Sequence, residues 1–177
     1  MNKVRVATTW LDGCSGCHMS FLDMDERLLD VFARVDLVYS PIVDAHEFPD
    51  GVDVTLVEGA VSSDEDEEKI HVIRHRSKLL VSFGDCAVTA NVPAMRNQFR
   101  VQDVLARGYV ENATEHQHVP SDGVPHLLRA ARPVHELVTV DLFLPGCPPP
   151  AEVIFYMLTE LLEGRMPDLS GRTRFGR

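Results

Sequence analysis

The sequence predicts an α/β fold with one mostly parallel sheet covered by helices on both faces. Two observations carry this prediction: strand-like runs alternate along the chain with segments of helical periodicity, and the interiors of the runs are rich in valine. The 177 residues suffice for one domain with a sizeable core but not for two. We therefore expect a single domain over residues 1–177.

The first part of the chain reads as strand, helix and strand. Residues 4–11 are rich in valine and threonine, which favours a strand. Apolar side chains then recur with helical spacing from His18 to Val35, which predicts a helix. A second strand is expected over residues 35–39, and Pro41 stops it.

The rest of the chain continues this alternation. Strands are expected over residues 52–57, 78–83 and 137–144, and helices over residues 63–77 and 151–163. Proline, glycine and histidine are scattered through residues 91–136, so that region is expected to be irregular with short helical pieces. The basic tail, residues 164–177, is expected to be extended. Five strands favour the flavodoxin-like strand order, in which ligands bind beyond the carboxyl ends of the strands.

The charge balance argues against a nucleic-acid partner. The net charge is −10, from 27 acidic and 17 basic side chains, whereas binding a phosphate backbone requires clustered lysine and arginine. Much of the excess lies in the run from Asp64 to Glu68. We expect this run to be the solvated first turn of a helix with Ser62 or Ser63 as its N-cap, since acidic side chains there complement the helix dipole.

The sequence shows no segment that would direct the chain to a membrane. No apolar run approaches the roughly 20 residues that a spanning helix needs, so no direct membrane insertion is expected. The N-terminus runs straight into the first strand, without the pattern of a signal peptide or a twin-arginine motif. We therefore expect the chain in the cytoplasm.

Four cysteines are the most informative residues of the chain. Cys14 and Cys17 are spaced C-x2-C after the first strand, and Cys86 and Cys147 follow the strands over residues 78–83 and 137–144. In a parallel sheet these strand ends lie at one edge, so the four thiols are expected to converge there. A reducing cytoplasm disfavours disulfides, which leaves metal binding or redox chemistry.

The spacing favours a [4Fe–4S] cluster held by Cys14, Cys17, Cys86 and Cys147. Glycines at positions 13, 16, 84 and 146 would let the backbone approach such a cluster closely. A zinc site usually pairs two closely spaced cysteine pairs, and this chain has only one such pair. A redox dithiol at Cys14 and Cys17 would leave Cys86 and Cys147 without a role. Zinc, a dithiol and unrelated buried thiols remain alternatives at this point.

Four short motifs resemble a known family in their order along the chain. They are WLDGCSGCHMS over residues 10–20, VEGAV over 57–61, GDCA over 84–87 and PGCPP over 145–149. They resemble the small subunit of [NiFe] hydrogenases, and most closely the short, single-cluster form found in soluble NAD-reducing (bidirectional) enzymes. The resemblance implies a flavodoxin-like domain that carries the proximal [4Fe–4S] cluster.

The resemblance also implies a role and partners. The chain would be an electron-transfer subunit with no catalytic residues of its own, in a complex that catalyses H2 + NAD+ = H+ + NADH. It would relay electrons between the nickel–iron site of a large subunit and the iron–sulfur and flavin-containing NAD-reducing (diaphorase) subunits. No cysteine follows Cys147, so the chain would hold one cluster.

Related subunits are the alternatives within this resemblance. In the corresponding subunit of respiratory complex I the first two ligands are adjacent cysteines, whereas Ser15 and Gly16 separate Cys14 from Cys17 here. That difference favours the hydrogenase branch. Energy-converting hydrogenases also have single-cluster small subunits, and they remain an alternative.

Three residues beside the cysteines are expected near the cluster or the partner. Glu58 would either cap the next turn or face the large subunit. His18 would either donate a hydrogen bond to a cluster sulfur or pack against the partner. Trp10 would belong to an apolar partner-facing patch with Leu11, Met19 and Val61. FMN is an option that the fold suggests, but no motif supports it, because Cys14 and Cys17 occupy the loop in which flavodoxins bind the phosphate.

Overall fold

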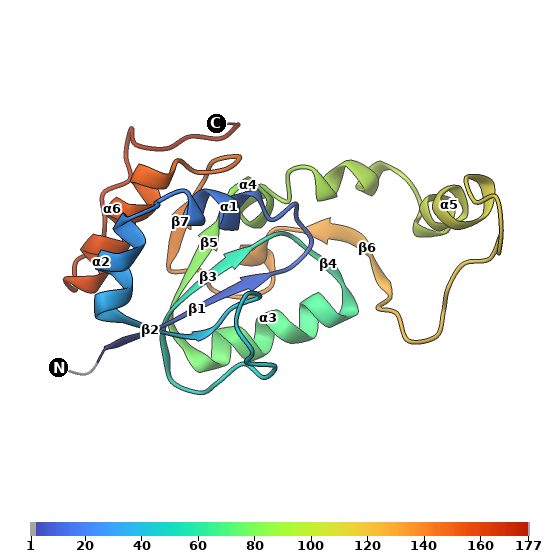
Figure 1. Ribbon diagram of the computed structural model, residues 1–177. Coiled ribbons are helices and arrows are strands. Elements are labelled where there is room, and N and C mark those ends of the chain that lie inside the picture. The colour runs from blue at the N-terminus through green and yellow to red at the C-terminus, as the bar shows by residue number, and fades with distance from the viewer. Residues whose placement is uncertain (1–2, 177) are drawn as a thin grey trace.

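A five-stranded parallel sheet forms the centre of the structure, a computed structural model that describes residues 3–176 (Figure 1). Its strands are β1 (Val4–Trp10), β2 (Val35–Tyr39), β3 (Val52–Glu58), β5 (Ser77–Phe83) and β7 (Leu142–Leu144). They lie in the order β2-β1-β3-β5-β7, and every neighbouring pair is parallel. Numbered by chain order within the sheet, this is the flavodoxin-like order 2-1-3-4-5, so the predicted fold class is confirmed.

The register aligns the last residues of four strands. Trp10 pairs with Glu58, Glu58 with Phe83, and Phe83 with Leu144. The loops after β1, β3, β5 and β7 therefore begin side by side, along what we call the carboxyl edge of the sheet.

Helices cover both faces of the sheet (Figure 1). The helices are α1 (Gly16–Leu22), α2 (Arg27–Arg34), α3 (Asp64–Arg76), α4 (Asp85–Thr89) and α6 (Ala151–Leu162). On one face α1, α2 and α6 pack together, with Ile154 and Leu56 in their core. On the other face Ile70 of α3 shares a core with Val57, the neighbour of Leu56 in β3, as the alternation of side chains along a strand requires. None of the helices within residues 3–176 is long and apolar enough to cross a membrane.

The helix predicted from His18 to Val35 is in fact two helices. α1 ends at Leu22 and α2 begins at Arg27, and Asp25 between them has a left-handed backbone with φ of 51°. Aspartate tolerates this conformation better than most residues, and its side chain competes with helical hydrogen bonding. The break lets Phe21, Met24 and Val31 all enter the same core.

The last predicted strand is shorter than expected. Residues 137–141 are not part of β7, because a 3-10 helix, η3 (Val134–Glu136), precedes them. The backbone N–H groups of Leu137 and Val138 both donate to the carbonyl of Val134. These two groups are therefore not available to a strand ladder. The Asp141 N–H is already bonded to the Leu80 carbonyl of β5, and β7 begins at the next residue.

Residues 91–132 form an arm that the sequence patterns describe only in part. It contains the short helices η1 (Pro93–Gln98), α5 (Val101–Ala106) and η2 (Arg107–Glu111) and the strand β6 (Leu127–Arg132). Figure 1 shows this arm extending away from the main sheet. β6 pairs antiparallel with β4 (Val61–Ser63), a pairing that the sequence did not predict. The Asn97 side chain exchanges two hydrogen bonds of 2.8 Å with the backbone of Ala131 and so ties η1 to β6.

Residues 164–176 turn back toward the sheet. Leu169 packs against the core that α6 shares, and the Arg172 guanidinium lies 3.9 Å from the ring centre of Tyr156. Figure 1 shows this segment passing over the same end of the sheet as α1 and α4. The sequence patterns gave no indication of this return.

The acidic run begins α3 as predicted, and Ser63 is the cap. Its Oγ accepts a hydrogen bond of 3.2 Å from the Asp66 backbone, and Asp66 Oδ2 accepts one of 3.0 Å from the Ser63 backbone. This reciprocal pair satisfies two donors at the start of the helix.

Ser63→Ala should lower the free energy of unfolding by about 1 kcal/mol, because it removes the capping acceptor. The measurement is urea unfolding of the full chain. Ser63→Thr keeps a capping hydroxyl and should stay close to wild type. An alanine variant as stable as the threonine variant would contradict the role of the cap.

Candidate metal centre

The four cysteines lie in loops and first turns at the carboxyl edge. Cys14 follows β1, Cys17 lies in the first turn of α1, Cys86 in the first turn of α4, and Cys147 follows β7. Cys17 is buried and Cys86 is partly buried, while Cys14 and Cys147 are exposed. The group is therefore anchored in the protein on one side and open on the other.

Gly84 permits the closest approach within this group. Its φ is +84°, and a Cβ added there would lie 2.1 Å from the Sγ of Cys17. No side chain fits at that distance, so the turn that precedes Cys86 can pass Cys17 only with glycine at this position. The glycine thus brings the first turns of α1 and α4 together.

Burial and neighbouring negative charges raise the pKa of two of the thiols. Burial raises the pKa of the Cys17 thiol above its ordinary value, and the charges of Glu58 and of the other three cysteines raise it further. Burial also raises the pKa of Cys86 to about 11, with Cys14 and Cys147 adding to the effect. A bound metal reverses this balance, because its positive charge favours the thiolate.

The four thiols enter the site from three different loops. The charges of the other three cysteines act on Cys17, and those of Cys14 and Cys147 act on Cys86. Across residues 3–176, no three His, Cys, Asp or Glu side chains are grouped as ligands of one ion. Asn91 Nδ2 lies 3.7 Å from the Sγ of Cys147 and donates toward it.

Glu58 ties the end of β3 to the first turn of α1. Its carboxylate is 2% exposed and accepts from the backbone N–H of Cys17 at 3.3 Å and of His18 at 3.0 Å. Ser15, at the start of α1, has a left-handed backbone and gives no side-chain cap. Glu58 therefore supplies from another strand the acceptor that α1 lacks locally.

His18 completes this arrangement. Its Nδ1 contacts the Glu58 carboxylate, and its ring lies 5.4 Å from the ring of Trp10, edge to face. The ring is also 6.1 Å from that of Phe83. His18 is 6% exposed, and its Nε2 has no hydrogen-bond partner within the described chain. Trp10 is more than one-third exposed, so it covers the His18 ring on the solvent side.

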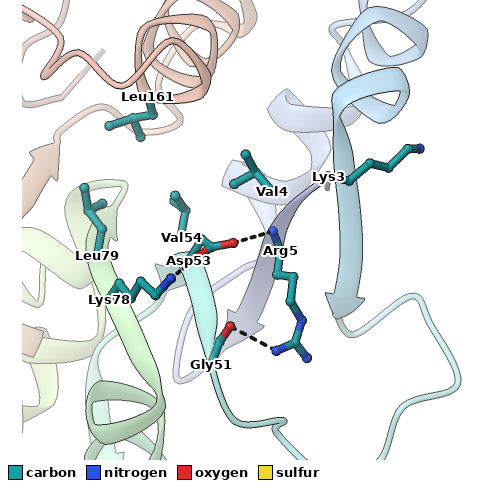
Figure 2. Close-up of a pocket in the computed structure, with 9 residues that line it drawn as sticks. All are labelled: Lys3, Val4, Arg5, Gly51, Asp53, Val54, Lys78, Leu79 and Leu161. Atoms are coloured by element: carbon teal, nitrogen blue, oxygen red, sulfur yellow. Dashed lines mark hydrogen bonds and ion pairs between the residues drawn. The ribbon is translucent and has the colours of Figure 1, made fainter. Parts of the chain in front are cut away.

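A cavity lies at the opposite edge of the sheet and is not part of this site. It measures about 600 Å³ and opens at the amino ends of the strands (Figure 2). Asp53 in its wall accepts hydrogen bonds of 2.8 Å from the Arg5 backbone and 2.7 Å from Lys78 Nζ. Its carboxylate is thus paired with groups that line the same cavity, and none of the cysteines reaches it.

Sequence reasoning placed Trp10, His18 and Glu58 near the cysteines, and the structure brings all three there. It gave no indication of Asn91, which lies outside every recognised motif. It also assigned no role to Asp85, although this residue stands in the GDCA motif. Both act through partners distant in sequence, so no local pattern marks them.

Comparison with known proteins places this geometry in context. A family model described as NADH ubiquinone oxidoreductase, 20 Kd subunit, matches residues 14–161, a range that contains all four cysteines. The chain is 43% identical over 175 residues to the NAD-reducing hydrogenase HoxS subunit delta of Cupriavidus necator, covering 94% of this chain and 82% of the relative. It is 38% identical over 168 residues to a subunit of the F420-non-reducing hydrogenase vhu of Methanocaldococcus jannaschii. That alignment covers 94% of this chain but only 58% of the archaeal protein.

Solved structures of hydrogenases are also similar to this chain. A chain from the crystal structure of an NAD+-reducing [NiFe]-hydrogenase in the H2-reduced state superposes with a TM-score of 0.94 at 41% identity, covering 98% of this chain and 99% of that one. A chain of the [NiFeSe]-hydrogenase of Dm. baculatum superposes with a TM-score of 0.63 at 19% identity, covering 99% of this chain and 70% of that one. The second likeness concerns the fold alone.

Glu58→Gln should destabilise the chain by about 1–3 kcal/mol, because the amide has one acceptor oxygen and turns a donor group toward N–H donors. Unfolding of the full chain in urea measures this. Glu26→Gln is the matched control, since Glu26 is exposed and makes no cap hydrogen bond. Equal stability of the two variants would contradict the capping role of Glu58.

In the metal-free full chain, iodoacetamide at pH 8 should modify Cys14 and Cys147 before Cys86 and Cys17. Because its pKa is raised from 9.0 to about 11, Cys86 has about 100-fold less thiolate at this pH than a thiol with the ordinary pKa. Cys17 is buried, and its pKa is raised as well. The reaction of Cys86 should accelerate as the pH rises toward 11. Peptide mass spectrometry follows each site, and urea should abolish the difference. Early modification of Cys17 in the folded chain would contradict the geometry.

Proposed function

This chain belongs to the NADH ubiquinone oxidoreductase 20 kDa subunit family, within its hydrogenase small subunits, and from that premise we propose that it is the electron-transfer small subunit of a cytoplasmic NAD-reducing [NiFe] hydrogenase. Cys14, Cys17, Cys86 and Cys147 would hold one [4Fe–4S] cluster. The partners would be a large subunit with the nickel–iron site and NAD-reducing subunits that carry iron–sulfur clusters and a flavin.

The observation that carries the proposal is the convergence of four thiols at the carboxyl edge. Burial and neighbouring negative charge raise the pKa of Cys17 and Cys86, so a bound metal would have to displace their protons. A bound iron–sulfur cluster supplies one-electron transfer. The identity of 43% to a subunit of an NAD-reducing hydrogenase supports NAD+ as the final acceptor.

The chain's own residues would position the cluster and limit its exposure to water. Gly84 lets the two helix starts approach, and Glu58 holds the first turn of α1, on which Cys17 lies. The Asn91 amide donates toward Cys147, and such donors stabilise thiolate ligands. These contacts hold the ligands before any metal arrives.

The open side of the site suits a protein partner. Val61, which was expected in the partner-facing patch, is fully buried, whereas Trp10, Met19 and Leu22 are exposed. These three side chains line one apolar hollow together with Ser15, the residue after Cys14. Such patches on soluble proteins mark interaction surfaces. We propose that the large subunit covers this patch and so brings its own redox site close to the cluster.

Metal analysis tests the proposal most directly. The complex, purified without oxygen, should contain iron and sulfide, and loss of the cluster of this chain should lower its content by about four iron and four sulfide. Alanine at any of the four cysteine positions should remove this cluster and abolish NAD+ reduction by H2. Val92→Ala, a change at an exposed side chain beside Asn91, should keep it.

Three outcomes would contradict the proposal. Zinc or no metal would favour a zinc or dithiol protein. A full cluster in a cysteine variant, read from iron content and EPR, would remove that cysteine from the ligand set. A chain that purifies alone as a well-behaved monomer would contradict the role as a subunit.

A further inference from the structure

Asp85 is a buried carboxylate that no cation pairs with within residues 3–176. It is 4% exposed and directly precedes Cys86. Burying a carboxylate is costly unless several donors satisfy its oxygens. The donors that do so here come from two other segments of the chain.

The first segment is the loop that carries Cys147. Asp85 Oδ1 accepts a hydrogen bond of 2.7 Å from the backbone N–H of Gly146, and the Asp85 N–H donates one of 2.9 Å to the Gly146 carbonyl. This reciprocal pair joins the residue before Cys86 to the residue before Cys147. The distance between these two cysteines therefore depends on it.

The second segment is the returning tail. Asp85 Oδ2 accepts a hydrogen bond of 2.7 Å from the backbone N–H of Gly176. The Thr173 hydroxyl donates to the carbonyl of Pro145, in the same Cys147 loop. The tail thus contacts the loop directly and also reaches it through Asp85.

We propose that Asp85 is a positioning residue that ties the Cys86 turn, the Cys147 loop and residues 164–176 into one unit. The tie holds Cys86 and Cys147 at one separation, and the tail takes part in positioning them. The inference deepens the proposed function and rests on it, because those two cysteines are ligands there. A carboxylate is required because each of its oxygens serves a donor from a different segment.

The test compares wild type with Asp85→Asn, each purified without oxygen together with its co-purifying subunits. Asparagine keeps the shape but has one acceptor oxygen and turns an N–H donor toward a second donor. Amide hydrogen exchange at Gly146 and over residues 164–176 should accelerate at least about tenfold. Mass spectrometry reads both segments, and unchanged exchange in either would overturn the proposal.

Asp168→Asn is the matched control. Asp168 lies in the same tail, is exposed, and accepts a hydrogen bond of 2.9 Å from the Ser170 backbone. The variant makes the same chemical change without touching either cysteine loop, so exchange at Gly146 should match wild type. Equal acceleration in both variants would overturn the proposal.

A shortened chain without residues 174–177 provides an independent experiment. It removes the Gly176 donor and leaves the Asp85–Gly146 pair, so exchange at Gly146 should accelerate less than in Asp85→Asn. Combining the two changes should add little, because both remove the same interaction. Fully additive effects would overturn the tie. The shortened chain should by itself exchange faster at Gly146 than wild type, and unchanged exchange there would overturn the tail's part in the tie even if Asp85→Asn does not fold.

The cluster itself gives the last readout. In Asp85→Asn the EPR spectrum of the reduced cluster should broaden, and iron loss to a chelator should be about tenfold faster, with Asp168→Asn unchanged. A wild-type chain without iron would contradict the proposed function, while the exchange data still decide the tie. If the iron-loaded chain has the same amide exchange and the same EPR spectrum in wild type and in Asp85→Asn, the tie is contradicted and the proposed function is not.

Discussion

The parallel pairing of β1, β3, β5 and β7 is the constraint on which the candidate metal centre depends. Their register puts Trp10, Glu58, Phe83 and Leu144 in one row, so the loops that follow them start as neighbours. Cysteines from three separate loops can then meet without a compact local motif. An antiparallel strand in this row would send its loop to the other edge, where the cavity beside Asp53 lies.

Buried polar side chains then fix loops that the sheet only brings near. Glu58 holds the first turn of α1, and Asp85 holds the loop before Cys147. Ser20 adds a third link, since its hydroxyl donates a hydrogen bond of 2.5 Å to the Pro149 carbonyl. None of the three is more than 5% exposed. Because water cannot replace these partners easily, each link constrains the backbone around a cysteine.

The electrostatics of the site divide it into two sides. On the inner side, burial and the charge of Glu58 oppose ionisation of Cys17, so positive charge from a bound metal would be needed there. On the outer side, Cys14 and Cys147 are exposed, and so is the apolar side chain of Met19 in α1. A redox group at this place would be held firmly by one side and would face a partner on the other, as an electron relay between subunits requires.

The sequence by itself determined the five strands of the sheet, the order of its elements and the edge at which the cysteines gather. Those features follow from valine-rich runs, helical spacing and the rule that parallel strands end together. Only the tertiary structure decided the break at Asp25, the pairing of β4 with β6, the late start of β7 and the return of the tail. It also decided which polar residues matter, since Asp85 is bonded to groups 61 and 91 residues away and Ser20 to one 129 residues away. Local patterns carry no information across such separations, because the contact exists only after the sheet has brought the segments together.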